Sequence, residues 1–335
     1  MRVAVIGAGG WGTALSIVAS RAGREVRLWS RNVSVVEDIN ERRLNGAYLE
    51  GCAVPKSVTA TTEPGSALQG AEVVILAAPS HATRAVLESM LGLFEPDAVF
   101  VSATKGVEVE TGRRMSEVVG EVLGSGAAER FACLSGPSFA QEVAAGQPTA
   151  VVASSRDESL AKLVQRALSA QSFRVYTNPD VVGTELGGAS KNVMALAAGM
   201  VAGLGLGTNT VSALVTRGLA EMTRLALAEG GRLETLMGLA GLGDLVLTCT
   251  GSLSRNRFVG QELGRGRALE EVLAGMHEVA EGVRTTRAIR LIAERRAVEM
   301  PITEEVHAVL YDGKSARAAV ESLISRPLKE EFEVT

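Results

Sequence analysis

Residues 1–12 read MRVAVIGAGGWG, and the fold prediction starts from this stretch. The apolar run Arg2–Ile6 predicts a buried strand. Gly7, Gly9 and Gly12 follow it as G-x-G-x-x-G at the start of a helical pattern. In such a motif the first glycine permits a tight turn, the second lets the backbone approach a pyrophosphate, and the third lets helix and strand pack closely. Because the free N–H groups of the helix start face an anion, the stretch predicts a dinucleotide-binding unit.

The first half of the chain continues this pattern, with short β-branched runs that alternate with amphipathic stretches. The alternation predicts an α/β Rossmann domain with a mostly parallel, doubly wound sheet. Further strands are expected at Glu25–Trp29, Val73–Ala77, Ala98–Ser102, Phe131–Ser135, Thr149–Ala153 and Phe173–Thr177. Helices between them are expected at Gly10–Ala22, Val33–Leu44, His81–Leu93 and Asp157–Leu168.

The pattern changes after Asn178-Pro179, where helical periodicity takes over and no strand is expected. The sequence therefore predicts a Rossmann domain at 1–178 and an all-α substrate domain at 179–335. Helices are expected at Ala213–Glu229, Ser254–Leu263, Ala268–Leu273, Val283–Arg295, Ile302–Leu310 and Ser315–Ser322. Residues 192–216 carry no charge, but their polar side chains and glycines indicate a buried helix plus a turn and not a membrane span.

Composition excludes several classes of protein. The 335 residues carry a net charge of −4, so no nucleic-acid partner is expected. Three widely spaced cysteines predict neither a disulfide framework nor a metal site, and they fit a reducing compartment. The apolar run at the N-terminus is too short for a signal peptide, so we expect a cytoplasmic protein.

The second strand ends in Ser30 and Arg31, where NAD-selective sites usually carry Asp or Glu. An arginine pairs with a 2′-phosphate, so NADP is expected to be accepted alongside NAD. The alternative is a solvated surface arginine. The third strand ends in Pro79-Ser80-His81. Ser80 is expected to cap the next helix. His81 is interpreted as a solvent-exposed residue or a hydrogen-bond partner, and not as a catalytic base.

Lysine is rare in this chain, since only six of the 34 basic residues are lysines. Two of them are therefore interpreted as candidate functional residues. Lys105 follows a strand in a small-residue loop, and Lys191 enters the uncharged helix. Desolvation at Lys191 should lower its pKa toward the range of an acid–base catalyst, which suits proton donation to a ketone oxygen. The alternative for each is a surface or snorkelling lysine.

Asp244 is a single carboxylate among small and apolar residues, so it needs a cationic or N–H partner, and Lys191 is the candidate. Ser254 is expected to cap a helix whose first turn holds Arg255 and Asn256. A helix start beside an arginine is a phosphate site. Cys249 is expected to be a core residue.

With these residues in place, the chain closely resembles the bacterial NAD(P)-dependent glycerol-3-phosphate dehydrogenases. The resemblance runs almost from end to end, and its motifs are GAGGWGTAL at 7–15, TKG at 104–106, SGPSFAQE at 135–142, GGASKN at 187–192, NTVSALVTRGLAEM at 209–222, GLAGLGDLVLTCT at 238–250, SLSRNR at 252–257 and MPI at 300–302.

The resemblance implies a homodimer that reduces dihydroxyacetone phosphate to sn-glycerol 3-phosphate with NADPH or NADH and so supplies phospholipid synthesis. It implies Lys191 as the catalytic base of the oxidative direction, with Lys105 and Asp244 beside it. Substrate contacts would come from Lys105, Gly136, Ser138, Lys191, Asp244, Ser254, Arg255 and Asn256. Besides the three motif glycines, the cofactor would be lined by Gly10, Trp11, Arg31, Tyr48, Lys105, Ala140, Arg255, Val279 and Glu281. Tyr48, Val279 and Glu281 are implied by the resemblance alone.

Two residues depart from the family pattern. Gly10 stands where a hydroxyl-bearing residue is frequent, and Ser190 stands where leucine is usual in G-A-L-K-N. Two other functions remain open at this point. One is a β-hydroxyacid dehydrogenase of the 3-hydroxyisobutyrate type, which the phosphate-suited helix start at Ser254 disfavours. The other is a non-catalytic NADP-binding sensor, which would not need Lys191 and Asp244 together.

Overall fold

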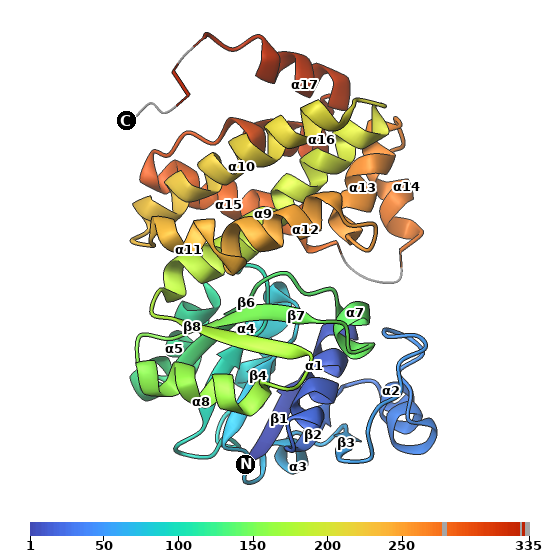
Figure 1. Ribbon diagram of the computed structural model, residues 1–335, viewed down its shortest axis with the longest axis vertical. Helices are drawn as coiled ribbons and strands as arrows, with labels where there is room; N and C mark the ends of the chain where they lie inside the picture. Colours follow the sequence, from blue (N-terminus) through green and yellow to red (C-terminus); the bar gives the residue numbers. More distant parts are fainter. Residues whose placement is uncertain (277–279, 329, 332–335) are drawn as a thin grey trace.

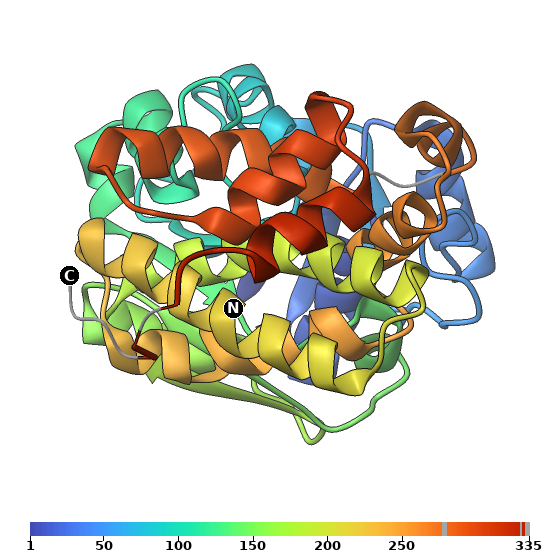
Figure 2. The ribbon, with the colours of Figure 1, turned by 90° about the horizontal axis from the view of Figure 1, so that it is seen from above.

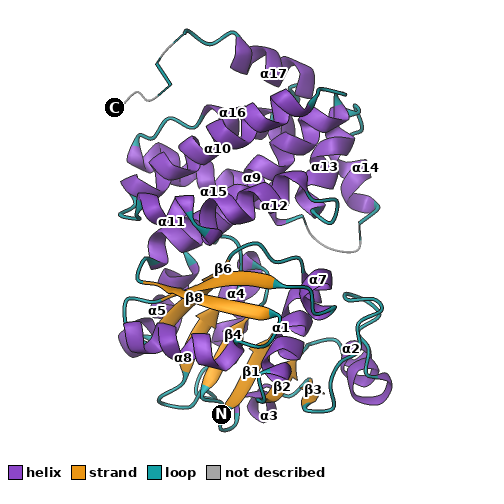
Figure 3. Cartoon of the chain, in the orientation of Figure 1, coloured by secondary structure: helices purple, strands orange, loops and turns teal. Residues whose placement is uncertain are grey.

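The computed structural model describes residues 1–276, 280–328, 330 and 331. A sheet flanked by helices forms one half of the molecule, and a bundle of helices forms the other (Figure 1, Figure 3). Strand β1 (Arg2–Ile6) begins at the end of the molecule far from the bundle, and its carboxyl end points toward it (Figure 1). Seen from above, the helices of the bundle cover the sheet (Figure 2). The predicted fold, an α/β sheet followed by an all-α region, is confirmed.

The sheet has eight strands among the described residues, in the order β3-β2-β1-β4-β5-β6-β7-β8. Neighbours pair in parallel, except β6 and β7, which are antiparallel. The chain order reverses between β1 and β4, and such a switch point opens a ligand crevice at the carboxyl ends of the strands. The strands after β1 are β2 (Glu25–Trp29), β3 (Val58–Thr61), β4 (Val73–Leu76), β5 (Val99–Ser102), β6 (Phe131–Ser135), β7 (Thr149–Ser154) and β8 (Phe173–Asn178).

Strand β3 is absent from the sequence-based prediction. Its four residues alternate between buried and more exposed, and it pairs only with β2 at the edge of the sheet. An edge strand of this length carries too few apolar residues to stand out in the sequence. The other predicted strands lie within two residues of the observed ones.

Helices around the sheet are α1 (Gly10–Arg21), α2 (Val33–Glu37), α3 (Pro64–Leu68), α4 (Ser80–Ser89), α5 (Met115–Leu123), α6 (Ser125–Glu129), α7 (Ala140–Ala144) and α8 (Glu158–Leu168). The single helix predicted at 33–44 is wrong, because α2 gives way to a π-helical turn at Asp38–Arg42. Arg43 then adopts φ 57°, a left-handed conformation that ends helical structure.

The bundle is built around α9 (Val181–Gly203), which is buried along most of its length. The helices that follow are α10 (Thr208–Ala228), α11 (Leu233–Met237), α12 (Asp244–Thr250), α13 (Arg255–Gly264), α14 (Leu269–Ala274), α15 (Glu281–Arg296), α16 (Pro301–Tyr311) and α17 (Ala316–Ile324). The uncharged segment begins as the predicted buried helix and turn, but its last part, residues 208–216, forms the start of α10 and is not buried. No helix in the described part of the chain has the length and apolar character that crossing a membrane requires.

Close packing of α9 on α13 depends on glycine. A Cβ on Gly199 would lie 2.1 Å from the Arg257 carbonyl oxygen, and one on Gly260 would lie 2.0 Å from that of Leu196. Any larger residue would push the two helices apart. These glycines therefore set the distance between the start of α13 and the middle of α9.

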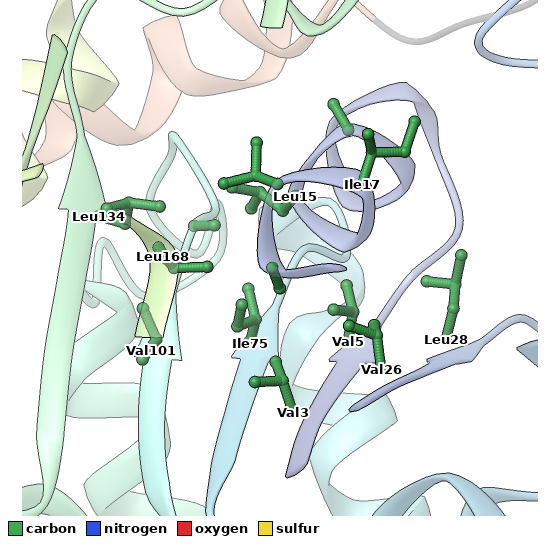
Figure 4. Close-up of a cluster of buried hydrophobic side chains, with 14 of the residues drawn as sticks. Val3, Val5, Leu15, Ile17, Val26, Leu28, Ile75, Val101, Leu134 and Leu168 are labelled. Carbon is green, nitrogen blue, oxygen red and sulfur yellow. The ribbon is translucent and has the colours of Figure 1, made fainter. Parts of the chain in front are cut away.

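The apolar core lies in separate clusters. One joins α1 to a face of the sheet and includes Leu15 and Ile17 of the helix with Val5 and Ile75 of the strands (Figure 4). Another fills the helical bundle around α9. Cys249 is buried in the second cluster, as predicted for a core residue. The three cysteines are unpaired.

Candidate active site

The turn between β1 and α1 brings the backbone close to β4. Gly7 adopts φ 114°, and a Cβ there would lie 2.9 Å from the Ala77 carbonyl carbon. A Cβ on Gly12 would lie 1.8 Å from the Gly7 oxygen, so both positions require glycine. A Cβ on Gly9 would meet no atom within 4 Å. This open space at the start of α1 fits a dinucleotide pyrophosphate against backbone N–H groups.

Other residues predicted to line the cofactor come from several elements of the sheet half. Gly10 and Trp11 open α1, and the Trp11 indole donates a hydrogen bond of 3.1 Å to the Ala103 oxygen. Ala140 begins α7. Arg31, at the end of β2, and Tyr48, in a turn, are exposed.

The predicted cap at Ser80 is wrong. Ser80 is the first residue of α4, and its hydroxyl caps no backbone N–H. Instead its side chain packs where a Cβ on Gly106 would stand, and its backbone N–H donates to Glu281 Oε1 at 3.3 Å. Burial raises the pKa of Glu281, although this hydrogen bond and the charge of Arg255 oppose the rise. Glu281 thus joins the start of α15 to the start of α4. Val279 lies outside the described residues.

Lys191 and Asp244 meet in the interior, 53 residues apart in the sequence. Lys191 Nζ lies 2.7 Å from Asp244 Oδ1 and donates a second hydrogen bond of 2.7 Å to the Thr248 hydroxyl. Asp244 is completely buried. Burial lowers the pKa of Lys191 to about 8, and the charge of Asp244 limits the fall. An amine with this pKa can give up and regain a proton near neutral pH.

Lys105 shares the same carboxylate. Its Nζ lies 2.9 Å from Asp244 Oδ2, 2.9 Å from the Gly136 oxygen and 3.2 Å from Ser138 Oγ. Gly136 takes φ 129°, and a Cβ there would lie 3.0 Å from Val151 Cα. The loops after β5 and β6 therefore converge on the carboxylate of α12. Two ammonium groups around one carboxylate leave an excess positive charge, which suits an anionic ligand.

A chain of amides connects this cluster to α13. Asn192 Nδ2 donates to the Lys105 oxygen at 3.1 Å, and its Oδ1 accepts from Asn256 Nδ2 at 3.0 Å. Asn256 Oδ1 accepts from the Gly282 N–H at 2.9 Å. Ser254 caps α13 by accepting from the Arg257 N–H, as predicted. Arg255, in the first turn, is exposed.

Sequence reasoning missed Thr248, Asn192 and the contact between Ser80 and Glu281. Thr248 lies four residues after Asp244, a spacing that places both side chains on one face of a helix, so this signal was present. Asn192 adjoins Lys191 but gave no signal of its own. The Ser80 contact joins residues 201 positions apart, which no local pattern reveals.

The described site combines a glycine-rich nucleotide crevice with a buried amine whose pKa is near neutrality. Two family models match the chain: the N-terminal model of NAD-dependent glycerol-3-phosphate dehydrogenase covers residues 2–161, and the C-terminal model covers 180–321. A glycerol-3-phosphate dehydrogenase [NAD(P)+] of Koribacter versatilis is 56% identical over 328 residues, which are 97% of each chain.

The chain belongs to the NAD-dependent glycerol-3-phosphate dehydrogenase family.

Other relatives agree with this assignment. The enzyme of the same name from Geobacter sulfurreducens is 50% identical over 98% of both chains. The crystal structure of glycerol-3-phosphate dehydrogenase from Coxiella burnetii superposes with a TM-score of 0.92 at 40% identity, and it covers 97% of this chain and 99% of its own. A D-mandelate dehydrogenase shares only the fold, with a TM-score of 0.65 at 14% identity, 96% of this chain and 100% of its own. The relatives thus support the glycerol-3-phosphate reaction and not the β-hydroxyacid alternative.

Proposed function

We propose that Lys191, Asp244 and Lys105 form the catalytic centre at which this chain reduces dihydroxyacetone phosphate to sn-glycerol 3-phosphate. The observation that carries the proposal is the buried Lys191 amine, held 2.7 Å from Asp244 and given a pKa of about 8 by burial. Ketone reduction needs a proton donor at the oxygen, and such an amine supplies one near neutral pH.

NADPH or NADH, held by the residues around the glycine turn, would supply the hydride for the carbonyl carbon. As the carbonyl oxygen gains negative charge, the Lys191 ammonium transfers a proton to it and becomes a neutral amine. In the oxidative direction the neutral amine removes the same proton from the hydroxyl. Asp244 orients Lys191 through its hydrogen bond, and Lys105 places a second positive charge beside the developing oxyanion.

The phosphate of the substrate is assigned to the start of α13. Ser254, Arg255 and Asn256 stand at this helix N-terminus, where backbone N–H groups and a guanidinium favour a dianion. Gly136 and Ser138 complete the site from the loop after β6. Arg255→Ala is expected to raise the KM for dihydroxyacetone phosphate, because a charge-assisted contact is worth about 1.5–3 kcal/mol. An unchanged KM would place the phosphate elsewhere.

We propose that the cofactor binds to the residues around the glycine turn between β1 and α1. Its contacts are Gly7, Gly9, Gly10, Trp11, Gly12, Arg31, Tyr48, Lys105, Ala140, Arg255, Val279 and Glu281. The exposed guanidinium of Arg31 stands at the end of β2, where a 2′-phosphate would lie. Arg31→Ala should therefore weaken NADPH relative to NADH, and equal KM changes for both cofactors would contradict this role.

We further propose that the chain works as two domains, 1–178 and 179–335, in a cytoplasmic homodimer. Separate apolar clusters in the sheet and in the bundle support the division. Sedimentation equilibrium of the purified chain tests the dimer, and a mass equal to the 34.9 kDa of one chain would contradict it.

The reaction is tested by following NADPH oxidation with dihydroxyacetone phosphate as the only acceptor. Turnover with this ketone, and none when NADP is offered with 3-hydroxyisobutyrate, is the expected result. No turnover together with tight NADPH binding would favour a sensor over an enzyme.

A further inference from the structure

A cavity of about 170 Å³ opens beside the proposed cofactor crevice. Its walls come from the start of α4, the segment after β5, and helices α15 and α16, and its lining residues are His81, Val109, Glu110, Arg284, Arg287 and Tyr311. A water molecule takes up roughly 30 Å³ of liquid, so the cavity has room for a small polyatomic group. No function described so far uses it.

The cavity adjoins the contact between Ser80 and Glu281. His81 follows Ser80 on α4, and Arg284 lies three residues after Glu281 on α15. The hydrogen bond from the Ser80 N–H to Glu281 thus holds together the two helix starts that carry His81 and Arg284. A group bound in the cavity would thus lie close to a bound dinucleotide.

Two guanidinium groups point to an anionic ligand. Arg284 and Arg287 are exposed and lie three residues apart, on one face of α15. Neither forms an ion pair with a carboxylate anywhere in the described ranges, whereas Arg290 and Arg296 of the same helix both do. Glu110 is the one carboxylate among the lining residues, so the lining carries more positive than negative charge.

The aromatic ring of Tyr311 holds one of these groups in place. The Arg287 guanidinium carbon lies 3.8 Å from the ring centroid, and the Tyr311 hydroxyl donates to the Val283 oxygen at 2.5 Å. A guanidinium stacked by its face keeps its N–H edge available for a planar or tetrahedral anion. The site is therefore partly preorganised.

The charges around His81 are also mostly positive. Burial lowers its pKa most, Arg284 and Arg31 lower it further, and Glu110 acts in the opposite direction. His81 thus stands within electrostatic reach both of Arg284 and of Arg31, the residue proposed to meet a 2′-phosphate.

We propose that Arg284, Arg287 and His81 form a binding site for a phosphate monoester. A phosphate dianion fits two guanidinium edges and an imidazole N–H. Two sources carry this chemistry: the 2′-phosphate of bound NADPH, a source that rests on the proposed function, and a free phosphate monoester.

Equilibrium binding distinguishes the two sources and needs no turnover, so it remains informative if the proposed reaction fails. NADPH and NADH are titrated by nicotinamide fluorescence against the whole chain, Arg284→Gln and Arg287→Gln. Inorganic phosphate is titrated by thermal stabilisation against the same three proteins, and phosphate binding at the substrate site, which neither substitution touches, is the same background in each titration. Arg317→Gln, an exposed arginine on α17, is the matched control.

If the cofactor is the source, Arg284→Gln weakens NADPH about ten-fold or more and leaves NADH within two-fold, as loss of a charge-assisted hydrogen bond predicts. If a free monoester is the source, both cofactors bind as before, and inorganic phosphate loses about ten-fold in affinity in the two variants but not in the control. Changes below two-fold for NADPH and for phosphate in both variants would overturn the proposal.

Discussion

Two buried charge clusters involve helix α9, and they differ in how their charges are matched. Glu185 accepts hydrogen bonds from the Ser116 N–H at 2.7 Å, the Ser116 hydroxyl at 2.6 Å and Arg114 at 3.1 Å. Lys191, six residues later, shares the single carboxylate of Asp244 with Lys105. The first cluster gives its carboxylate a cation and two further donors. The second contains one more cation than anion.

Under the proposed function, this difference separates a structural cluster from a reactive one. The Glu185 carboxylate fastens the start of α5 to α9, and its hydrogen bonds come from within the protein. The excess positive charge around Asp244 is costly in the interior and would become favourable if an anionic substrate bound there, as we propose. Both clusters are buried, so the balance of cations and anions, more than burial, distinguishes the Glu185 cluster from the Asp244 cluster.

The largest expected effect comes from Lys191→Ala. Loss of the proton donor should lower kcat/KM for reduction by about 10²- to 10⁴-fold, the usual contribution of a general acid–base group. NADPH affinity, measured by fluorescence, should stay within a few-fold of the parent. Lys162→Ala, in the exposed pair with Glu158, is the control and should keep full activity. A Lys191 variant within ten-fold of the parent would mean that another group supplies the proton.

Glu185→Ala should affect folding and not turnover. Removing one partner of a buried pair costs about 3–5 kcal/mol of unfolding free energy, which urea denaturation measures. In the folded fraction, kcat/KM should stay within a few-fold of the parent. Glu158→Ala, at an exposed pair, should cost at most about 1 kcal/mol. If activity fell as far as in Lys191→Ala, the distinction between the clusters would fail.

The pH dependence sharpens the comparison further. Reduction uses the Lys191 ammonium, whose pKa burial lowers to about 8, so kcat/KM for reduction should fall above about pH 8. Oxidation uses the neutral amine and should rise up to the same pH. Because the charge of Lys105 helps to lower the pKa of Lys191, Lys105→Ala should move the remaining inflection to higher pH. A shift to lower pH would contradict this arrangement.

The smallest effect is expected at Ser190, beside Lys191. Its hydroxyl is buried and has no hydrogen-bond partner among the described residues. Because an unsatisfied buried hydroxyl costs about 1–3 kcal/mol, Ser190→Ala should raise the unfolding free energy by about 1 kcal/mol. Ser16, whose hydroxyl donates to the Gly12 oxygen at 2.9 Å, is the matched control, and Ser16→Ala should be destabilising. Equal effects of the two substitutions in urea would refute this reasoning.

Much of the sheet half was predictable because its signals are local. The run Arg2–Ile6 and the glycines after it specify strand, turn and helix within one short stretch, and seven of the eight observed strands were expected. The strand Val58–Thr61 escaped prediction because pairing with β2, and not its own composition, makes it a strand. The helix predicted at 33–44 failed because a π-helical turn at Asp38 replaced its second half.

The sequence by itself determined the nucleotide-binding turn, the cap at Ser254 and the need of Asp244 for a cation, since each follows from sterics or desolvation at one position. Only the tertiary structure decided that Lys191 and Lys105 both meet Asp244, and that Glu281 reaches the Ser80 N–H. The reason is packing: glycines at 199 and 260 set how closely α13 approaches α9, and such interhelical distances depend on both surfaces at once.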